Sequence, residues 1–342
     1  MRGRRTGDVP GRDAFDLLAL AERKAELGLT TSVIIPAREE GPRVGAVVTA
    51  IRRAMDPVGT TGTALIDELV VIDGMSRDDT AATAERAGAR VIAHEPSGKG
   101  AALRRGVEVT SGDLIAFVDA DVRDPDPWLA VGTLAPLLLD EDVRLVKSAA
   151  QRSWQGGADT GTTGASATGA GGGGGRVTEL TVRPLLALLW PELAHIAQPL
   201  AGEYAADRAL LESLPFETGY GVELGLLLDT SRLHGPESIA QVDLGVRGHE
   251  HQPLDALGRM AGELLLVMMD RLALEGRALD DRAPDDDGLE GRIATDALLL
   301  PRPVRGADGV LRIESTQVRR APLAPLVSGD PRRRRRGPSP TG

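Results

Sequence analysis

The chain of 342 residues contains no cysteine. That absence excludes disulfides, thiolate metal sites and cysteine nucleophiles, and it is typical of a reducing compartment. Aromatic residues make up only 2% of the sequence, so the core has to be built from leucine, valine, isoleucine and alanine. No apolar run is long enough to cross a bilayer, and no apolar stretch follows the basic N-terminus. We therefore expect a cytoplasmic protein without a membrane span or a secretory signal.

Basic residues are fewer than acidic residues, with 40 lysines and arginines against 50 aspartates and glutamates. The formal net charge is -10, which argues against a nucleic-acid-binding surface for the chain as a whole. Hydrophobic residues account for 42% of the sequence, an ordinary proportion for a globular protein. A chain of this length can form one large α/β domain or two smaller ones.

Strand and helix patterns alternate through the first part of the chain. Short apolar runs predict buried strands at 32–36, 68–73, 89–93 and 114–118. Helical spacing and capping residues predict helices at 14–28, 43–55, 80–87 and 98–109, with Asp78 and Asp79 as capping residues for the third helix. This alternation predicts a parallel, doubly wound sheet.

The ends of these strands carry the first candidate site residues. Ligands of such sheets bind outside the carboxyl ends of the strands, and Pro36, Asp73 and Asp119 all fall at such ends. Asp119 and Asp121 could bind a divalent cation of the kind that a nucleotide-sugar diphosphate needs to neutralise its leaving group. Taken alone, however, an Asp-x-Asp pair is more often a solvated turn at a strand end.

The second half of the chain is less regular. Residues 158–175 are mostly glycine, alanine and threonine and end in five glycines, which is typical of a flexible linker. Further patterns predict helices at 180–189 (capped by Thr178), 224–233 and 254–275, and a half-buried strand at 239–246. After residue 276 the chain is acidic and rich in proline, and residues 328–342, with five consecutive arginines, are expected to be a disordered tail.

A second candidate site lies where the glycine run meets a predicted helix. Glycine-rich backbone that leads into a helix N-terminus, with Arg176 beside it, can bind a phosphate or a carboxylate. The alternative is an arginine at a helix start that faces solvent.

Several segments occur in one order along the chain and together resemble GT-A glycosyltransferases. In the first half these segments are Pro36-Ala37-Arg38-Glu39-Glu40, residues 71–80, Gly98-Lys99-Gly100 and Phe117-Val118-Asp119-Ala120-Asp121. The second half narrows the resemblance to the actinobacterial glucosyl-3-phosphoglycerate synthases. Its segments are residues 145–148, 174–180, 198–204, 219–223 and 241–249. The resemblance covers residues 30 to 270, approximately.

The resemblance implies a GT-A fold, in which a mostly parallel, Rossmann-like sheet is flanked by helices and followed by a helix-rich, acceptor-binding portion. It implies the transfer of glucose, with retention, from a nucleotide diphosphate-glucose such as UDP-glucose to the 2-hydroxyl of 3-phosphoglycerate. It also implies a Mg²⁺- or Mn²⁺-dependent enzyme that forms a homodimer. The expected parts are a tail and helix (1–29), a nucleotide-sugar-binding half (30–150), an acceptor-binding and catalytic half (151–275) and the C-terminal segment (276–342).

The resemblance also assigns roles to individual residues. The implied metal ligands are Asp121 and His249. The implied nucleotide-sugar pocket comprises Pro36, Ala37, Glu40, Asp73, Ser76, Lys99, Asp119 and Ala120. The implied acceptor contacts are Gly175, Arg176, Val177, Thr178, Tyr220 and His251. The implied catalytic residues are Glu223, Asp121 and Arg176.

The chain departs from the family pattern at three places. Glu39 stands where the family usually has asparagine, His251 stands where relatives often have asparagine, and the glycine run is longer. Two other functions stay open. One is a related transferase, either a mannosyl-3-phosphoglycerate synthase or a polyprenyl-phosphate sugar transferase. The other is a non-catalytic protein that binds nucleotide sugars.

Overall fold

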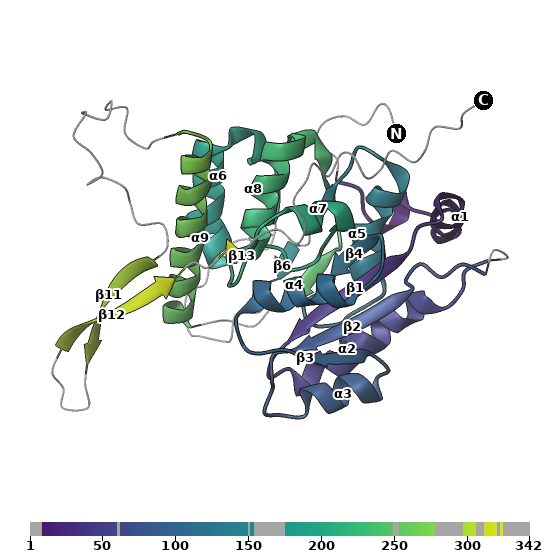
Figure 1. Ribbon diagram of the computed structural model, residues 1–342, viewed down its shortest axis with the longest axis horizontal. Coiled ribbons are helices and arrows are strands. Elements are labelled where there is room, and N and C mark those ends of the chain that lie inside the picture. The colour runs from purple at the N-terminus through teal and green to yellow at the C-terminus, as the bar shows by residue number, and fades with distance from the viewer. Residues whose placement is uncertain are drawn as a thin grey trace, which may run out of the picture.

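The computed structural model describes residues 9–59, 62–149, 151–153, 175–248, 253–277, 297–305, 311–319 and 322–323. At its centre is a seven-stranded sheet with the strand order β3-β2-β1-β4-β7-β5-β9 (Figure 1). Its strands are β1 (Thr31–Ala37), β2 (Glu68–Asp73), β3 (Arg90–Ala93), β4 (Leu114–Phe117), β5 (Leu145–Ser148), β7 (Tyr204–Asp207) and β9 (Ile239–Val242).

The sheet is mostly parallel, as predicted. Strand β1 lies between β2 and β4 and is parallel to both, and β3 is parallel to β2. Only β7 runs the other way within this sheet, antiparallel to β4 and to β5. The carboxyl ends of β1, β2 and β4 therefore meet at one edge of the sheet.

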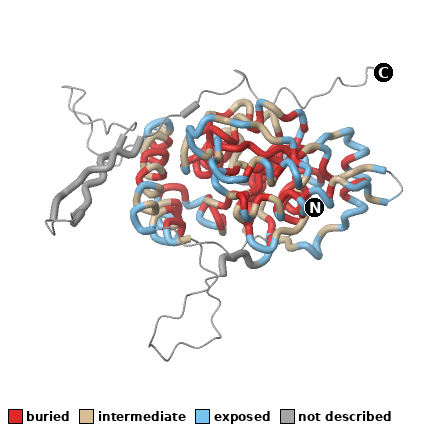
Figure 2. Tube along the Cα trace, turned by 90° about the horizontal axis from the view of Figure 1, so that it is seen from below, coloured by how far each residue is buried: buried red, intermediate tan, exposed pale blue. Residues whose placement is uncertain are grey.

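Helices cover both faces of the sheet, because neighbouring strand residues point to opposite faces. On β1, Val33 and Ile35 belong to one buried cluster, while Ile34 belongs to the other. Helices of the first cluster are α1 (Leu17–Leu27), α2 (Gly41–Arg52), α3 (Thr80–Arg86) and α5 (Trp128–Leu139). Helices of the second are α4 (Lys99–Val109), α6 (Arg183–Leu189), α7 (Arg208–Ser213), α8 (Val222–His234) and α9 (Leu254–Leu274). Figure 2 shows the buried residues running through the middle of the described body.

Three small sheets complete the described structure. Strand β6 (Gln151–Ser153) pairs with β10 (Val246–Gly248), and β8 (Phe216–Glu217) pairs with β13 (Pro322–Leu323). The hairpin of β11 (Ala297–Arg305) and β12 (Leu311–Arg319) contacts α9. No pattern singled out this hairpin, because it falls in a stretch noted only for its acidic and proline-rich composition. The expected tail at 328–342 lies outside the described residues.

Three local predictions need correction. The predicted strand 239–246 is interrupted after Val242, because the Asp243 side chain accepts a hydrogen bond from the Gly245 N–H (2.7 Å) and turns the chain toward β10. Thr178 does not cap a helix. Helical structure already begins at Arg176, so Thr178 lies inside it and opens a π-helical stretch, Thr178–Val182.

The third correction concerns the start of α3. Asp79 occupies the position before the helix but makes no side-chain capping bond. Asp78 supplies the bond instead, because one of its carboxylate oxygens accepts from the Thr80 N–H at 3.0 Å. Its other oxygen accepts from the Gly41 N–H at 3.0 Å, so the same side chain also ties α3 to the start of α2.

Candidate active site

The loops that follow β1 and β2 are joined by hydrogen bonds at the predicted crevice. Ala37 pairs with Asp73 across the two strands. The buried Asp73 carboxylate accepts from the Ser76 hydroxyl (2.6 Å) and from the Ser76 N–H (3.2 Å). The Ser76 hydroxyl in turn accepts from the Glu39 N–H at 2.9 Å. These bonds fix the positions of two residues predicted for the nucleotide-sugar pocket, Asp73 and Ser76.

The remaining predicted pocket residues on this side lie close by. Pro36 pairs with Ile72 in the sheet. The Glu40 N–H donates to the Thr80 hydroxyl at 2.8 Å, and the Glu40 carboxylate is 3.3 Å from the Arg43 guanidinium. Ala120 lies in the loop after β4, and its side chain is buried in the core, so contact with a ligand there would come from the backbone.

Lys99 brings two distant parts of the chain together. Its ammonium nitrogen lies 2.7 Å from Asp119 Oδ1 and 2.7 Å from Glu223 Oε1. The three side chains come from the start of α4, from the loop after β4 and from the start of α8. Burial alone would lower the pKa of Lys99, but Asp119 and Glu223 outweigh it and raise this pKa well above the usual lysine value. Lys99 is therefore a fixed positive charge between two carboxylates.

Asp121 has a different electrostatic environment from its neighbour. Burial and the negative charge of Asp119 raise the pKa of Asp121, against the opposing effects of Lys99 and Arg43. Two carboxylates held so close repel each other, and a divalent cation would relieve that repulsion. Their hard oxygen atoms suit Mg²⁺ or Mn²⁺. A cluster of three or more potential metal ligands does not occur within the described ranges, and His249 lies outside them.

The buried Lys147 was not among the predicted site residues. Its side chain is 1% exposed, its ammonium donates to the Ala201 carbonyl at 2.8 Å, and it lies 4.6 Å from the centroid of the Tyr204 ring. Burial lowers the pKa of Lys147 to about 8, although Glu223 acts in the opposite direction. A lone lysine in the apolar run Leu145–Ser148 was the available signal.

Lys147 supports Asp119 through the backbone. A Cβ atom on Gly202, the residue after Ala201, would overlap the Asp119 carboxylate. Only glycine allows this approach. The bond from Lys147 to Ala201 therefore holds the backbone against which Asp119 packs.

The predicted acceptor residues are only partly accessible. Arg176 and Tyr220 are exposed, whereas the side chains of Val177 and Thr178 are 7% and 2% exposed. The backbone carbonyl of Gly175 accepts from the Glu179 N–H at 3.0 Å. Val177 packs in the core, so a contact of this residue with an acceptor would come from its backbone. His251 lies outside the described residues.

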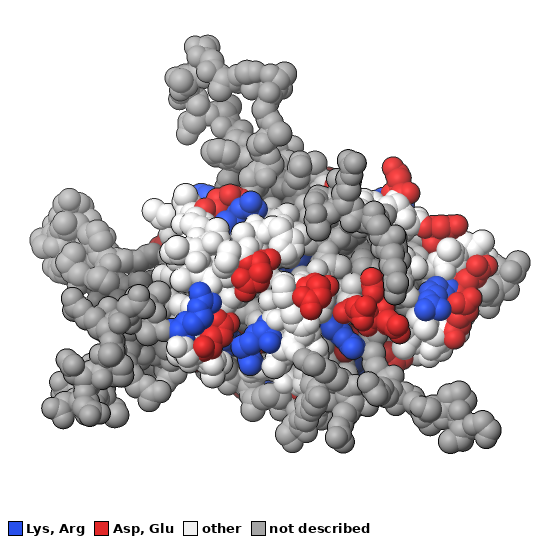
Figure 3. Space-filling view, turned by 90° about the horizontal axis from the view of Figure 1, so that it is seen from above, with Lys and Arg blue, Asp and Glu red and all other residues white. Residues whose placement is uncertain are grey.

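The described surface shows mixed charge. On the face in Figure 3, acidic and basic side chains are interspersed, and the part of that face that is described carries no broad basic patch. Among the helices that the structure describes, none combines the length and the hydropathy that crossing a membrane requires.

Comparison with known proteins places these features in a family. A model of glycosyl transferase family 2 matches residues 32–143. The chain is 45% identical over 258 residues to the glucosyl-3-phosphoglycerate synthase of Mycobacterium tuberculosis, a match that covers 73% of this chain and 76% of that protein. It is 43% identical over 299 residues to the glucosyl-3-phosphoglycerate synthase of Mycolicibacterium paratuberculosis, with 85% of each chain covered.

Solved structures of similar proteins match most of the chain. Mannosyl-3-phosphoglycerate synthase from Rubrobacter xylanophilus matches with a TM-score of 0.76 and 37% identity, covering 93% of this chain and 96% of that one. The M. tuberculosis glucosyl-3-phosphoglycerate synthase in complex with Mn²⁺, UDP-glucose and phosphoglyceric acid matches with a TM-score of 0.70 and 35% identity, covering 94% and 99%. The same enzyme with Mg²⁺ and UDP matches with a TM-score of 0.70 and 36% identity, covering 93% and 98%.

Proposed function

The chain belongs to the glucosyl-3-phosphoglycerate synthase family, and from this premise we propose that it transfers glucose from UDP-glucose to the 2-hydroxyl of 3-phosphoglycerate with retention of configuration. The product is glucosyl-3-phosphoglycerate. The observation that carries this proposal is the convergence of Asp119 and Glu223 on Lys99 at the carboxyl edge of the sheet, in a chain 45% identical to such a synthase.

The donor side of the proposed site is built on the ends of β1, β2 and β4. Pro36, Ala37 and Glu40 would line the nucleoside pocket, together with Asp73 and Ser76, which hold each other in place. Asp121 would bind Mg²⁺ or Mn²⁺, with Asp119 beside it. His249 is the further ligand expected from the resemblance. When bound, the cation would neutralise the diphosphate leaving group.

The acceptor side is proposed to depend on Arg176. Its exposed guanidinium lies at the start of the helix that leads into α6, where a phosphate or a carboxylate could be bound by the side chain and by backbone N–H groups. Gly175, Val177 and Thr178 would contribute mainly through their backbone, and Tyr220 and His251 would complete the acceptor contacts.

The proposed reaction needs one bond to form as another breaks. The bond between the anomeric carbon and the diphosphate oxygen breaks, and the 2-hydroxyl oxygen of the acceptor attacks from the same face. The departing diphosphate takes the hydroxyl proton. Glu223, held by Lys99, would accept hydrogen bonds from the glucose hydroxyls and orient the sugar. Glu223 is not proposed as a covalent nucleophile.

A mannosyl transfer to the same acceptor is the second candidate. It is favoured by the likeness to the Rubrobacter xylanophilus mannosyl-3-phosphoglycerate synthase, with its TM-score of 0.76. The segment Gly175-Arg176-Val177-Thr178 suits a small anionic acceptor and argues against a transfer to a polyprenyl phosphate. A non-catalytic binding protein would be expected to lose Asp121, His249 or Glu223, and all three are present.

A donor-by-acceptor matrix tests the proposal. Purified protein is incubated with UDP-glucose or GDP-mannose, with or without 3-phosphoglycerate, in Mg²⁺ or Mn²⁺, and the product is identified by mass spectrometry. The proposal expects nucleotide release that depends on 3-phosphoglycerate and is greatest with UDP-glucose. Faster turnover of GDP-mannose would favour the second candidate. UDP binding without turnover of any pair would overturn both.

An acceptor-site variant tests the role of Arg176. Arg176→Ala is expected to raise the KM for 3-phosphoglycerate about 10²-fold, because an anion loses a charge-assisted contact. The affinity for UDP should not change. Arg23→Ala is the matched control, since Arg23 is exposed on α1 and pairs with Glu26. An unchanged KM in Arg176→Ala would contradict this role.

The expected assembly and organisation are also open to measurement. We propose a cytoplasmic homodimer, in which residues 30–150 bind the nucleotide sugar and residues 151–275 bind the acceptor and complete the catalytic site. Residues 1–29 and 276–342 would form the terminal segments of this division, and they pack on the two halves through α1 and β13. Light scattering of the full chain gives the mass, and a monomer would contradict the expected dimer.

A further inference from the structure

Helix α9 presents one stripe of side chains to the turn that carries Tyr220, one of the residues proposed for the acceptor site. This turn joins β8 to α8 and comprises residues 218–221. Glu263, Val267 and Arg271 are four residues apart and therefore share one face of α9. Glu263 and Val267 contact the turn itself, and Arg271 contacts the strand before it and the helix after it.

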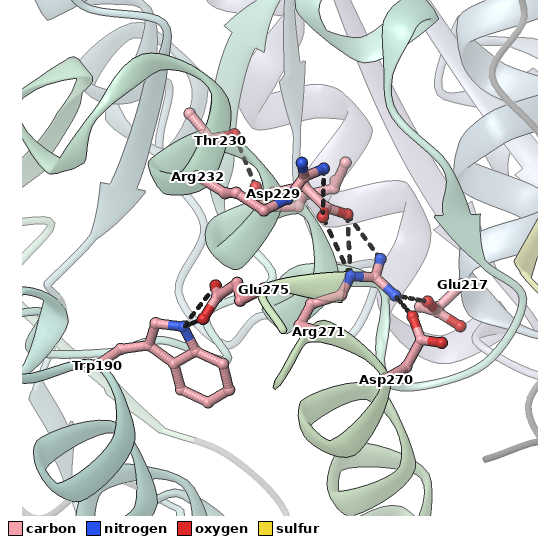
Figure 4. Close-up of polar contacts among 9 residues, drawn as sticks. Trp190, Glu217, Asp229, Thr230, Arg232, Asp270, Arg271 and Glu275 are labelled. Atoms are coloured by element: carbon pink, nitrogen blue, oxygen red, sulfur yellow. Dashed lines mark hydrogen bonds and ion pairs between the residues drawn. The ribbon is translucent and has the colours of Figure 1, made fainter. Parts of the chain in front are cut away.

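Arg271 binds both β8 and α8, the two elements that the turn joins. Its guanidinium donates to Glu217 Oε1 in β8 at 2.9 Å and to Asp229 Oδ2 in α8 at 2.6 Å (Figure 4). The three side chains are between 1% and 3% exposed. Because one arginine pairs with a residue before the turn and with a residue in the helix after it, the angle between β8 and α8 is fixed.

Glu263 binds the middle of the turn. Its carboxylate accepts from the Tyr220 N–H at 2.7 Å. A Cβ atom on Gly219 would overlap that same carboxylate, so the backbone of the turn lies directly against it. Between the two polar contacts, Val267 packs against Gly221.

The other side of the turn supports the start of α4. The Ala101 N–H donates to the Thr218 carbonyl at 3.2 Å, and a Cβ atom on Gly100 would overlap the Glu217 carbonyl. Lys99 lies at this helix start, and its ammonium reaches Glu223 one residue into α8. A shift of the turn would therefore move both members of the Lys99–Glu223 pair.

We propose that Glu263 and Arg271 are positioning residues, which hold the turn so that Tyr220, Glu223 and Lys99 meet the sugar and the acceptor in the reactive geometry. Neither residue needs to touch a substrate. This inference rests on the proposed transferase function for its kinetic consequences, while the positioning itself can be measured without turnover.

Glu263 gives the cleaner test, because an Arg271 variant could simply fail to fold. In Glu263→Ala the Tyr220 N–H loses its acceptor and the turn loosens. In Glu263→Gln the amide oxygen can still accept this bond, although the charge is lost. Glu275→Ala is the matched control. Glu275 lies at the end of the same helix and accepts from the Trp190 indole N–H at 2.9 Å, away from the turn (Figure 4).

Two readouts are taken on the full chain. Hydrogen exchange of the peptide that covers residues 216–223 should accelerate in Glu263→Ala and stay close to wild type in Glu263→Gln and Glu275→Ala. Steady-state kinetics should show kcat reduced about tenfold and the acceptor KM raised in Glu263→Ala, with UDP affinity unchanged. Glu263→Gln should recover most of the activity.

The outcomes separate positioning from general stability and from the proposed function. If Glu263→Ala and Glu275→Ala affect exchange and kinetics equally, or if Glu263→Gln is as defective as Glu263→Ala, the positioning role is overturned. If the wild type transfers no sugar, the proposed function fails, and the exchange of residues 216–223 still decides whether Glu263 holds the turn.

Discussion

Two clusters of ionised side chains share helix α8, and they differ in how far they are closed off from water. Glu223, at the start of α8, belongs to the cluster with Lys99 and Asp119, in which the lysine and the aspartate side chains are each 21% exposed. Asp229, six residues later, belongs to the cluster with Arg271 and Glu217. These three side chains are at most 3% exposed, while their outer partners Asp270 and Arg232 are 22% and 35% exposed.

This difference in exposure indicates that the Lys99 cluster belongs to the candidate active site and that the Arg271 cluster stabilises the fold around it. In the closed cluster, several short bonds satisfy the arginine, and the two acceptors Glu217 and Asp229 are themselves buried. In the open cluster one ammonium lies between two carboxylates at the edge of the sheet, where a ligand can exchange partners with it. Removing one partner should therefore cost mainly stability in the closed cluster and mainly activity in the open cluster.

The largest effect is expected in the closed cluster. Arg271→Met should lower the free energy of unfolding by about 3–5 kcal/mol, because Glu217 and Asp229 would remain buried after losing the guanidinium that both of them bind. Urea unfolding measures this change. Arg259→Met should change stability by less than about 0.5 kcal/mol, since Arg259 is 47% exposed in its pair with Asp255. Equal changes in the two variants would remove the distinction between closed and exposed pairs.

The open cluster should respond in its activity. Glu223→Gln is expected to lower kcat about 10²-fold, because a neutral amide is a poorer acceptor for sugar hydroxyls and no longer balances Lys99. Its unfolding free energy should change far less than that of Arg271→Met. Glu212→Gln, in a pair with Arg208 on α7, serves as the control. A stability loss in Glu223→Gln as large as that in Arg271→Met would contradict the comparison.

Lys147 should have a smaller effect, with a characteristic pH dependence. Lys147→Met is expected to lower kcat/KM about tenfold, because the backbone behind Asp119 is less well held. In the wild type, activity should fall as pH rises through about 8, where Lys147 loses its charge. This decrease in activity above about pH 8 should be absent in Lys147→Met.

Stability gives an independent check on Lys147. Its folded pKa of about 8 lies below the ordinary lysine value of 10.5, so the unfolded chain binds more protons between these values. The contribution of Lys147 to stability should therefore rise with pH in this window, opposite to the change in activity. Stability and activity that fall together in this window would contradict the assignment.

The smallest effect is expected at Glu68, whose side chain is 24% exposed in its pair with Arg90. Burial tends to raise the pKa of Glu68, but the Ser111 N–H, the Ser32 hydroxyl and Arg90 lower it overall. The resulting stabilisation is present above its ordinary pKa of 4.5 and is lost as pH falls through the lower folded value. In Glu68→Gln, the free energy of unfolding should therefore decrease less on acidification than in the wild type, by a difference below about 1 kcal/mol in urea unfolding. The same decrease in both proteins would show that Glu68 is not its source.

Local patterns predicted the fold well as far as β4, but they did not predict α5 (Trp128–Leu139). The predicted strand at 68–73 matches β2, and the predicted helix start near Gly98 matches α4. These elements are short and bounded by strong signals, with buried apolar runs for strands and glycine or proline at their ends. Because parallel strands end at one edge, the pattern also indicated that residues after β1, β2 and β4 would lie together.

The second half could not be predicted to the same degree. No local period reveals that β7 inserts antiparallel between β4 and β5, because this pairing depends on residues 57 to 93 positions apart. Lys147 and Arg271 look like interruptions of apolar runs. Their partners, Ala201 and Asp229, are distant in sequence, so no spacing rule connects them.

By itself, the sequence determined the class of fold, the carboxylates after β4 and, through its ordered motifs, the family. Those features depend on local propensity and on residues that lie close together along the chain. Only the tertiary structure decided that Asp119 meets Glu223 through Lys99, and that α9 holds the turn before Glu223. Such contacts arise when the packing of apolar faces brings distant segments into register, and charged groups buried at those points must then find partners, because an isolated buried charge is too unfavourable to persist.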